Sequence, residues 1–429
     1  MNRDECLRKR CQVTGGNLSL AYARPLRIIR GEMQYLFDDT GRRYLDAYNN
    51  VPHVGHCHPE VVAAACEQMR TLNTNTRYLS DHFNEYAEAL IATMPPALDT
   101  CFFVNSASEA NELALRMSRV ATGHRDTIVA EAAYHGHTTT LIDISPYKHD
   151  GPGGGGAPEW VHTVPNPDTY RGAYRDDDAA HRYASAVRDR IAQIESSGRG
   201  LAAFIAETYP SVGGQIITPG GYLAEVYRHV RRAGGICVAD EVQTCYGRIG
   251  SAFYAFDQQG VVPDVVVLGK PIGNGHPLAA VVTRRDIADA FDNGMEFFST
   301  FGGSTLSCVI GKTVLEVTRR EGLQHHAQVV GQKLLEQFEQ LRGKYPLIGD
   351  VRGAGLFLGI ELVRDRDSLE PAGCEASEVS NALKEAGILI GTDGPHHNVL
   401  KIRPPMPFDD ADADELVAGL DHALERIAT

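Results

Sequence analysis

The chain has 429 residues, of which 43% are hydrophobic and 22% are charged, and its formal net charge at pH 7 is −14. This length suffices for a large and a smaller domain. The acidic balance argues against nucleic acid as a partner, because phosphate backbones require a basic surface. Neither a secretory signal nor an apolar run of membrane-spanning length is evident. We therefore expect a cytoplasmic protein that binds neither nucleic acid nor membranes.

The nine cysteines are odd in number and include no C-x-x-C pair, so the pattern does not indicate a disulfide framework. Cys66, Cys101, Cys237 and Cys308 stand in apolar stretches. We expect these four side chains to be buried in a protein from a reducing compartment.

Short β-branched segments alternate with helical patterns, which is typical of an α/β domain with a mostly parallel sheet. Pro59 suits the first position of one helix, and apolar residues at helical spacing predict two more over 108–121 and 219–233. The predicted strands are 101–104, 127–130, 202–206, 236–239, 265–268 and 279–282.

The pattern changes after about residue 327. A long amphipathic helix is predicted over 330–341, a strand over 355–362, and a final helix with one apolar stripe over 416–427. We predict a large domain at 46–326 and a small α+β domain at 327–429, with residues 1–45 packing on the small domain.

Four polar side chains lie at or just beyond the carboxyl ends of predicted strands: Asn105, Glu207, Asp240 and Lys270. In open α/β sheets this edge is where ligands bind. We therefore expect these side chains to converge on one site.

Asp240 follows a buried apolar run, where a carboxylate is costly unless a cation or a hydrogen-bond donor accompanies it. A protonated ring nitrogen of a pyridine cofactor is such a partner; a helix cap or a metal ligand is the alternative. Lys270 stands between glycines, where a lysine can lose its proton and attack an aldehyde. A surface turn is the alternative for Lys270.

Ser106 and Glu109 have the spacing of a capping box at the start of a helix, and such a helix start is an anion site suited to a cofactor phosphate. A plain capped helix is the alternative. Tyr134 can stack on an aromatic ring. The spacing of His53, His56 and His58 fits neither common zinc pattern, and His135 and His137 are interpreted likewise, so we expect no metal.

These segments together resemble the class III aminotransferase family of fold type I pyridoxal-phosphate enzymes. The resemblance spans nearly the whole chain, and the number and order of its motifs make it specific. The motifs are Tyr44-Leu45-Asp46, Gly55 to Pro59, Asn105 to Asn111, Tyr134-His135-Gly136, Ala239 to Gln243, Gly269-Lys270 and Thr300 to Gly303.

The resemblance implies that Lys270 is the Schiff-base lysine and that Asp240 is the partner of the pyridine nitrogen. Thr300 is implied to reach the cofactor phosphate of the other subunit, because family members are homodimers with shared active sites; a tetramer is the alternative. The other implied cofactor-binding residues are Ser106, Ala107 and Ser108 around the phosphate, Tyr134 and Val242 on the two ring faces, Gln243 near the ring hydroxyl, and His135 and Glu207.

Two positions depart from family members that act on α-amino acids. Lys401 stands where an arginine usually grips the substrate carboxylate, and Val212 stands where a glutamate gates that arginine. The bidentate carboxylate clamp is therefore not expected to form.

The chain resembles instead the ethanolamine-phosphate phospho-lyase branch of the family. This implies elimination of phosphate from a small phosphoamine, and we expect Arg77, Lys401 and Asn50 to hold the substrate phosphate; alternatively, Arg77 pairs with a carboxylate at the subunit interface. The alternative functions are an ω-aminotransferase that uses a keto-acid acceptor, and a nucleotide-binding or regulatory module built on the glycine-rich turns. The matching stretches are Asn49 to Val51, His53 to His56, Asn73 to Arg77, Pro167 to Gly172 and Asn398 to Lys401.

Overall fold

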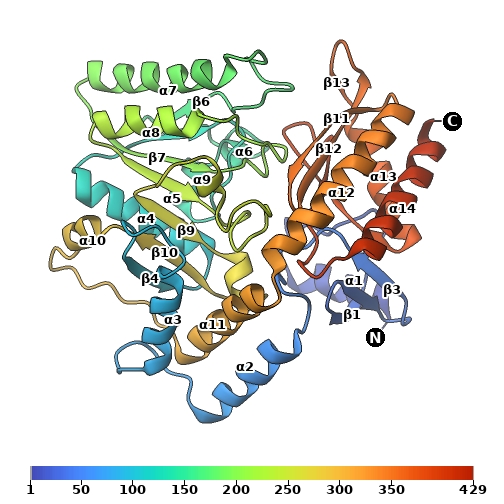
Figure 1. Ribbon diagram of the computed structural model, residues 1–429, viewed down its shortest axis with the longest axis horizontal. Coiled ribbons are helices and arrows are strands. Elements are labelled where there is room, and N and C mark those ends of the chain that lie inside the picture. Colours follow the sequence, from blue (N-terminus) through green and yellow to red (C-terminus); the bar gives the residue numbers. More distant parts are fainter. Residues whose placement is uncertain (1, 429) are drawn as a thin grey trace.

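The computed structural model describes residues 2–428, and its largest sheet has seven strands in the order β4-β10-β9-β8-β7-β5-β6 (Figure 1). β10 runs antiparallel to both of its neighbours, and the other pairings along the sheet are parallel. This confirms the mostly parallel α/β sheet predicted from the sequence. The strands are β4 (Thr100–Val104), β5 (Asp126–Ala130), β6 (Val161–Val164), β7 (Leu201–Glu207), β8 (Ile236–Asp240), β9 (Val265–Leu268) and β10 (Ala279–Thr283).

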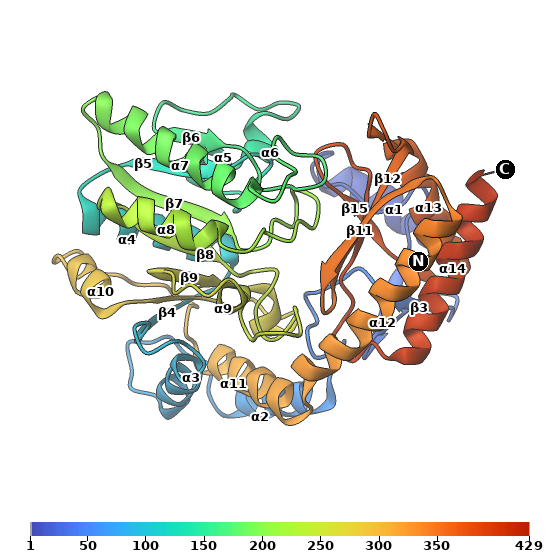
Figure 2. The same cartoon turned by 45° about the horizontal axis from the view of Figure 1, so that its top comes forward.

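Helices cover both faces of this sheet (Figure 2). Because successive side chains of a strand point to opposite faces, Ala203 and Ile205 of β7 pack with α4 (Ala107–Thr122). Phe204 packs on the other face with α7 (Ala179–Ser196) and α8 (Tyr222–Arg232). The remaining helices of this part are α2 (Pro59–Thr71), α3 (Asp81–Ile91), α5 (Thr139–Asp143), α6 (Pro146–His149), α9 (Ala255–Gln258), α10 (Arg285–Phe291), α11 (Thr305–Arg320) and the 3₁₀ helix η1 (Lys270–Gly273).

The C-terminal part forms a second sheet in the order β11-β12-β16-β15, with β13 beside β12. α12 packs on β11 and on α14, and α13 packs on α14. The bounds are α12 (Leu323–Lys344), β11 (Ile348–Ala354), β12 (Phe357–Asp365), β13 (Glu370–Pro371), α13 (Gly373–Ala386), β14 (Ile388–Leu389), β15 (Gly391–Asp393), β16 (Val399–Ile402) and α14 (Asp410–Ala428).

The N-terminal strands lie beside this C-terminal part in both views (Figures 1 and 2). β3 pairs in parallel with β14, which closes a third sheet in the order β1-β2-β3-β14. The domain limits at 45/46 and 326/327 stay predictions. The N-terminal elements are α1 (Arg3–Val13), β1 (Ile28–Glu32), β2 (Tyr35–Asp38) and β3 (Arg43–Asp46).

Two predicted elements begin later in the structure than the sequence indicated, because a glycine turns the chain before each of them. The helix predicted from residue 219 begins at Tyr222, because Gly221 has the left-handed conformation with φ 86°. The strand predicted from residue 355 begins at Phe357, because Gly355 turns the chain with φ 54°.

The predicted burial of the four cysteines is only partly confirmed. Cys66 is exposed, because it lies away from the stripe of α2 that buries Val61 and Gln68; the prediction of a buried side chain was wrong. Cys101 is partly buried, and Cys237 and Cys308 are buried, as expected. All nine cysteines are free within the part of the chain that the structure describes. No helix among residues 2–428 is long and apolar enough to cross a membrane; the cytoplasmic location stays a prediction.

Candidate active site

A cavity of about 370 Å³ opens at the carboxyl edge of the large sheet. Asn105 follows β4, Glu207 ends β7, Asp240 ends β8, and Lys270 follows β9, and all of these side chains line the cavity. Residues 275–278 line it too, because β10 runs antiparallel and therefore begins at this edge. The structure thus brings together the strand-end residues that the sequence singled out. The other predicted residues that line the cavity are Ser106, Ala107, Ser108, Tyr134, His135, Val242 and Gln243.

Asp240 is buried and held by several donors. Its Oδ2 lies 2.9 Å from Asn111 Nδ2 and 2.8 Å from His135 Nδ1, and its Oδ1 accepts from the Val242 N–H at 3.2 Å. Asn111 also donates to the backbone carbonyl of His135 at 2.8 Å, so the two donors are held together. These bonds fix the orientation of a carboxylate at the cavity wall, where it can pair with a cationic ring nitrogen.

Lys270 lies in a sparsely populated backbone conformation with φ 30°, at the turn that ends β9. Burial and the nearby Arg403 lower the pKa of Lys270 to about 8, although Asp240 and Glu207 act in the opposite direction. At pH 7 about a tenth of this amine is therefore neutral, which is the form that a nucleophile or a base requires.

Gly269 lets the end of β9 approach its neighbours. A Cβ at Gly269 would lie 3.0 Å from Ala107 Cβ and 3.5 Å from Val242 Cγ1. Both neighbours line the cavity. A side chain at this position would therefore press on residues predicted to contact the cofactor.

Glu207 is buried beside Asp240 and Lys270. Burial and the negative charge of Asp240 raise the pKa of Glu207 to about 7, although the Ser211 N–H donates to this carboxylate. Like-charged carboxylates in one site favour a proton on one of them.

Ser106 caps the start of α4 as predicted, whereas the Glu109 carboxylate reaches the residue before the cap. Ser106 Oγ accepts from the Glu109 N–H at 3.2 Å, and the Glu109 carboxylate accepts from the Asn105 N–H at 3.3 Å. The N–H groups of a first helical turn have no partner within the helix, so this end can receive a phosphate. Ser108 Oγ lies nearby and contacts His137 Nδ1 at 2.9 Å.

Two predicted substrate residues are not among the described residues that line the cavity. Asn50 is buried and donates through Nδ2 to Gln243 Oε1 at 2.9 Å. Lys401 Nζ lies 2.9 Å from Asp393 Oδ2. Their roles in substrate binding stay predictions.

Two other predicted residues lie away from this cavity. Arg77 pairs with Glu296 at 3.2 Å and lies 4.3 Å from the centre of the Phe298 ring. Thr300 is exposed in the same region. The predicted contact of Thr300 is with the cofactor phosphate of a second copy of the chain, and the roles of both residues stay predictions.

The sequence reasoning missed Arg403 and the role of Asn111. Arg403 is buried and donates through Nη1 to Ser211 Oγ at 2.7 Å and to Gln243 Oε1 at 2.5 Å. Side chains alternate along an extended chain, so Lys401 and Arg403 share a face. Since Lys401 was predicted to contact the substrate, this two-residue spacing could have pointed to Arg403 as well. Asn111 lies one helical turn after Ala107, on the same face of α4.

The three neighbouring histidines have separate partners. His53 Nε2 lies 2.9 Å from the Tyr246 carbonyl, His56 Nε2 lies 2.7 Å from Asp46, and His58 Nε2 lies 3.3 Å from Glu321. Among residues 2–428 no group of three or more His, Cys, Asp and Glu side chains is arranged to hold a metal ion.

The family model described as Aminotransferase class-III matches residues 21–424. The chain belongs to the class III aminotransferase family. It is 47% identical to "Alanine--glyoxylate aminotransferase 2-like" of Drosophila melanogaster, over 100% of this chain and 88% of the relative. It is 42% identical to "Ethanolamine-phosphate phospho-lyase homolog 1" of Caenorhabditis elegans, over 99% of this chain and 94% of the relative.

The fold of this class III family member is shared with a solved phospholyase from Arthrobacter in complex with phosphoethanolamine. The two have a TM-score of 0.93 and 37% sequence identity, over 98% of this chain and 99% of the other. These findings confirm the predicted family, the fold type I architecture and pyridoxal phosphate as the cofactor. They favour an enzyme over the nucleotide-binding module.

The residues of the cavity fit pyridoxal phosphate. Asp240 offers a buried carboxylate to the ring nitrogen, Tyr134 and Val242 line the walls available to the ring faces, and the start of α4 offers N–H groups to the phosphate. Lys270 offers an amine of lowered pKa that would be able to bond to the cofactor aldehyde.

Proposed function

We propose that this class III family member is a pyridoxal-phosphate-dependent phospho-lyase that eliminates phosphate from a small phosphoamine. The proposed substrate is O-phosphoethanolamine, and the products are acetaldehyde, ammonia and phosphate. The names of a 42% identical relative and of the phosphoethanolamine-bound neighbour support this proposal.

The observation that carries the proposal is the state of Arg403. Its guanidinium is buried, its Nη1 donates to two uncharged oxygens, and its Nε has no hydrogen-bond partner among residues 2–428. Burial lowers the pKa of Arg403, and the nearby Asp393 and Glu207 offset this only in part. Neither carboxylate hydrogen-bonds to the guanidinium, and a buried charge without a directly bonded counter-ion is costly. A substrate anion beside Gln243 would supply that bonded counter-ion.

Lys401 adds a second positive charge near Arg403, and this differs from the single arginine that binds the substrate carboxylate in related aminotransferases. Val212 replaces the gating glutamate, and Lys401 already pairs with Asp393 at 2.9 Å. Two cations beside the cavity suit a dianionic phosphate better than a single carboxylate.

The chemistry divides between the cofactor and the residues of the chain. Pyridoxal phosphate supplies an aldehyde that bonds to amines and a ring that accepts electrons. The neutral Lys270 amine would remove a proton from the substrate carbon that bears nitrogen. Asp240, oriented by Asn111 and His135, keeps the ring nitrogen protonated.

Loss of that proton allows the C–O bond of the neighbouring carbon to break, and phosphate leaves with the bonding electrons. The released enamine takes up one water and hydrolyses to acetaldehyde and ammonia. Arg403 and Lys401 hold the phosphate group by charge-assisted contacts both before and after the C–O bond breaks. This elimination reaction consumes no keto acid.

The test is phosphate release from phosphoethanolamine by the holoenzyme without any keto acid. Phosphate and acetaldehyde should appear in equal amounts, and Lys270→Ala should release neither. Absence of both products from the wild type would overturn the proposal.

The second candidate is an aminotransferase, favoured by the aminotransferase name of the 47% identical relative. In that case Lys270 would return the proton to the cofactor side, and amino groups would pass to a keto acid. Transfer of nitrogen to pyruvate or glyoxylate without phosphate release would establish this alternative.

We also propose that the active form is a homodimer. Large apolar side chains are exposed around Arg77 and Thr300, and a contiguous exposed apolar surface marks an interaction site. A second copy covering this surface would place Arg77 and Thr300 near the partner's cavity. Sedimentation should show a dimer. The exposed side chains are Leu72, Tyr78, Leu79, Met295, Phe298 and Phe301.

A further inference from the structure

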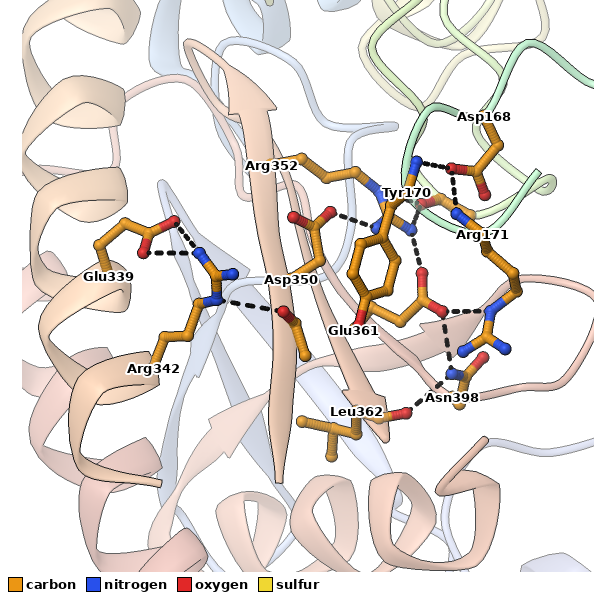
Figure 3. Close-up of polar contacts among 12 residues, drawn as sticks. Asp168, Tyr170, Arg171, Glu339, Arg342, Asp350, Arg352, Glu361, Leu362 and Asn398 are labelled. Atoms are coloured by element: carbon orange, nitrogen blue, oxygen red, sulfur yellow. Dashed lines mark hydrogen bonds and ion pairs between the residues drawn. The ribbon is translucent and has the colours of Figure 1, made fainter. Parts of the chain in front are cut away.

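A buried carboxylate outside the cavity bridges two arginines from distant segments (Figure 3). Glu361 of β12 accepts from Arg171 Nε at 2.5 Å and from Arg352 Nη2 at 2.8 Å. Asn398 Nδ2 adds a third donor at 3.2 Å. Burial raises the pKa of Glu361, but Arg352 and Arg171 together lower it below its ordinary value, so the carboxylate stays ionised. We call Arg171, Arg352 and Glu361 the arginine–glutamate cluster.

The cluster docks a loop of the large sheet on the C-terminal sheet (Figure 3). Arg171 lies in the loop after β6, where the Asp168 carboxylate accepts from the N–H groups of Tyr170 at 2.8 Å and of Arg171 at 3.0 Å. A Cβ at Gly349 of β11 would lie 2.3 Å from the Tyr170 hydroxyl, so this close approach requires glycine. The Pro167 to Gly172 motif therefore serves this junction and does not line the cavity.

Arg352 extends the cluster to the segment 211–215. Its Nε and Nη2 donate to the Gly214 carbonyl at 3.0 and 2.6 Å. In the same segment Ser211 accepts from Arg403 at 2.7 Å, and its N–H donates to Glu207. The segment thus connects the cluster to two groups of the active site.

The same segment also reaches Lys401. Gln215 Nε2 donates to Asp393 Oδ2 at 3.3 Å, and that carboxylate oxygen lies 2.9 Å from Lys401 Nζ. Asn398 immediately precedes β16 and donates to the Leu362 carbonyl at 2.8 Å. These contacts, with Glu361 opposite the first residue of β16, fix where the strand begins.

We propose that the arginine–glutamate cluster is a positioning device, which holds segment 211–215 and β16 so that Arg403 and Lys401 face the substrate phosphate. Glu361, Arg171 and Arg352 are then positioning residues that contact neither cofactor nor substrate. The expected change in KM rests on the proposed function, whereas the expected change in the mobility of segment 211–215 and β16 does not.

Glu361→Gln tests this with little change in volume. The KM for phosphoethanolamine should rise about tenfold, within the range of a weakened charge-assisted contact, and kcat should change less than about twofold. Its effect should be non-additive with that of Lys401→Gln, because both act on the same phosphate contact. Arg352→Gln should reproduce the rise in KM.

The matched control is Asp264→Asn. Asp264 is a buried carboxylate that also bridges two arginines, Arg231 at 3.1 Å and Arg284 at 2.5 Å, but it stands at the opposite end of β9 from Lys270. If the cluster only stabilises the fold, Glu361→Gln and Asp264→Asn should both lose thermal stability, and neither should raise the KM more than the other. An equal rise in KM for the two variants would overturn the proposal.

Hydrogen exchange of the holoenzyme gives a readout that does not depend on the reaction. Amide exchange in residues 211–215 and 399–403 should be faster in Glu361→Gln and unchanged in Asp264→Asn. Unchanged exchange in Glu361→Gln would refute the positioning role even in an active phospho-lyase. If the wild type releases no phosphate, the proposed function fails, and the exchange comparison still decides the role of the cluster.

Discussion

The Nδ1 atom of His135 lies 2.8 Å from Oδ2 of Asp240, and the same oxygen lies 2.9 Å from Asn111 Nδ2. Asp240 is the end of a central strand, whereas its two partners come from the loop after β5 and from α4. The carboxylate is thus fixed from two sides before any ligand binds. This preorganisation makes the electrostatic role of Asp240 testable.

Asp240→Asn should lower kcat by at least about 100-fold, because an asparagine cannot keep a ring nitrogen protonated and the electron sink weakens. Cofactor binding should be partly retained, since Lys270 and the phosphate contacts remain. Steady-state kinetics and the absorbance of the bound cofactor measure the two effects. A near-normal rate would make Asp240 a structural residue.

Asn111→Ala should lower kcat by about tenfold, less than Asp240→Asn, because a hydrogen bond to a charged group contributes roughly 1.5–3 kcal/mol and His135 still holds the carboxylate. Asn111→Asp would add a like charge beside Asp240 and should be worse. Kinetics of the two variants at one pH provide the comparison. An effect of Asn111→Ala larger than that of Asp240→Asn would contradict this order.

Lys270→Ala should abolish both turnover and the visible absorbance of the cofactor bonded to the protein, because no other lysine among residues 2–428 lines the cavity. Lys312→Ala is the control, since Lys312 pairs with Glu85 at 2.7 Å on the surface. Spectra of the two purified proteins suffice. Full activity with bound cofactor in Lys270→Ala would refute the assignment.

Cofactor uptake by the apoenzyme should accelerate as the pH rises through about 8. Burial and Arg403 lower the pKa of Lys270 to about 8 from the ordinary 10.5, and only the neutral amine attacks an aldehyde. Glu207, whose pKa is raised to about 7 by burial and Asp240, loses its proton earlier in the same titration. Stopped-flow absorbance between about pH 6.5 and 9.5 follows the rate, and acceleration only towards 10.5 would contradict the lowered pKa.

Arg77→Ala should raise the KM for phosphoethanolamine by about 10- to 150-fold, since a charge-assisted contact to phosphate contributes roughly 1.5–3 kcal/mol. Affinity for the cofactor and any activity on unphosphorylated amines should be spared. Arg70→Ala is the control, because Arg70 is an exposed arginine of α2. Equal losses on both kinds of substrate would assign Arg77 to the interface.

The sequence by itself determined the fold class and the residues that converge at the sheet edge. Asn105, Glu207, Asp240 and Lys270 could be found because each directly ends or follows a short buried strand. Parallel strands bring their carboxyl ends to one edge, so local pattern was enough. The capping residue of α4 could also be predicted from local sequence, since a helix cap depends on neighbours within one turn.

Only the tertiary structure decided which distant groups surround those residues. Arg403 meets Gln243 and Ser211 across long stretches of chain, and Glu361 of the C-terminal sheet meets Arg171 of the loop after β6. No local period encodes such partners. Burial sums over all elements packed around a group, so the lowered pKa of Lys270 and the exposure of Cys66 also depended on the packed chain.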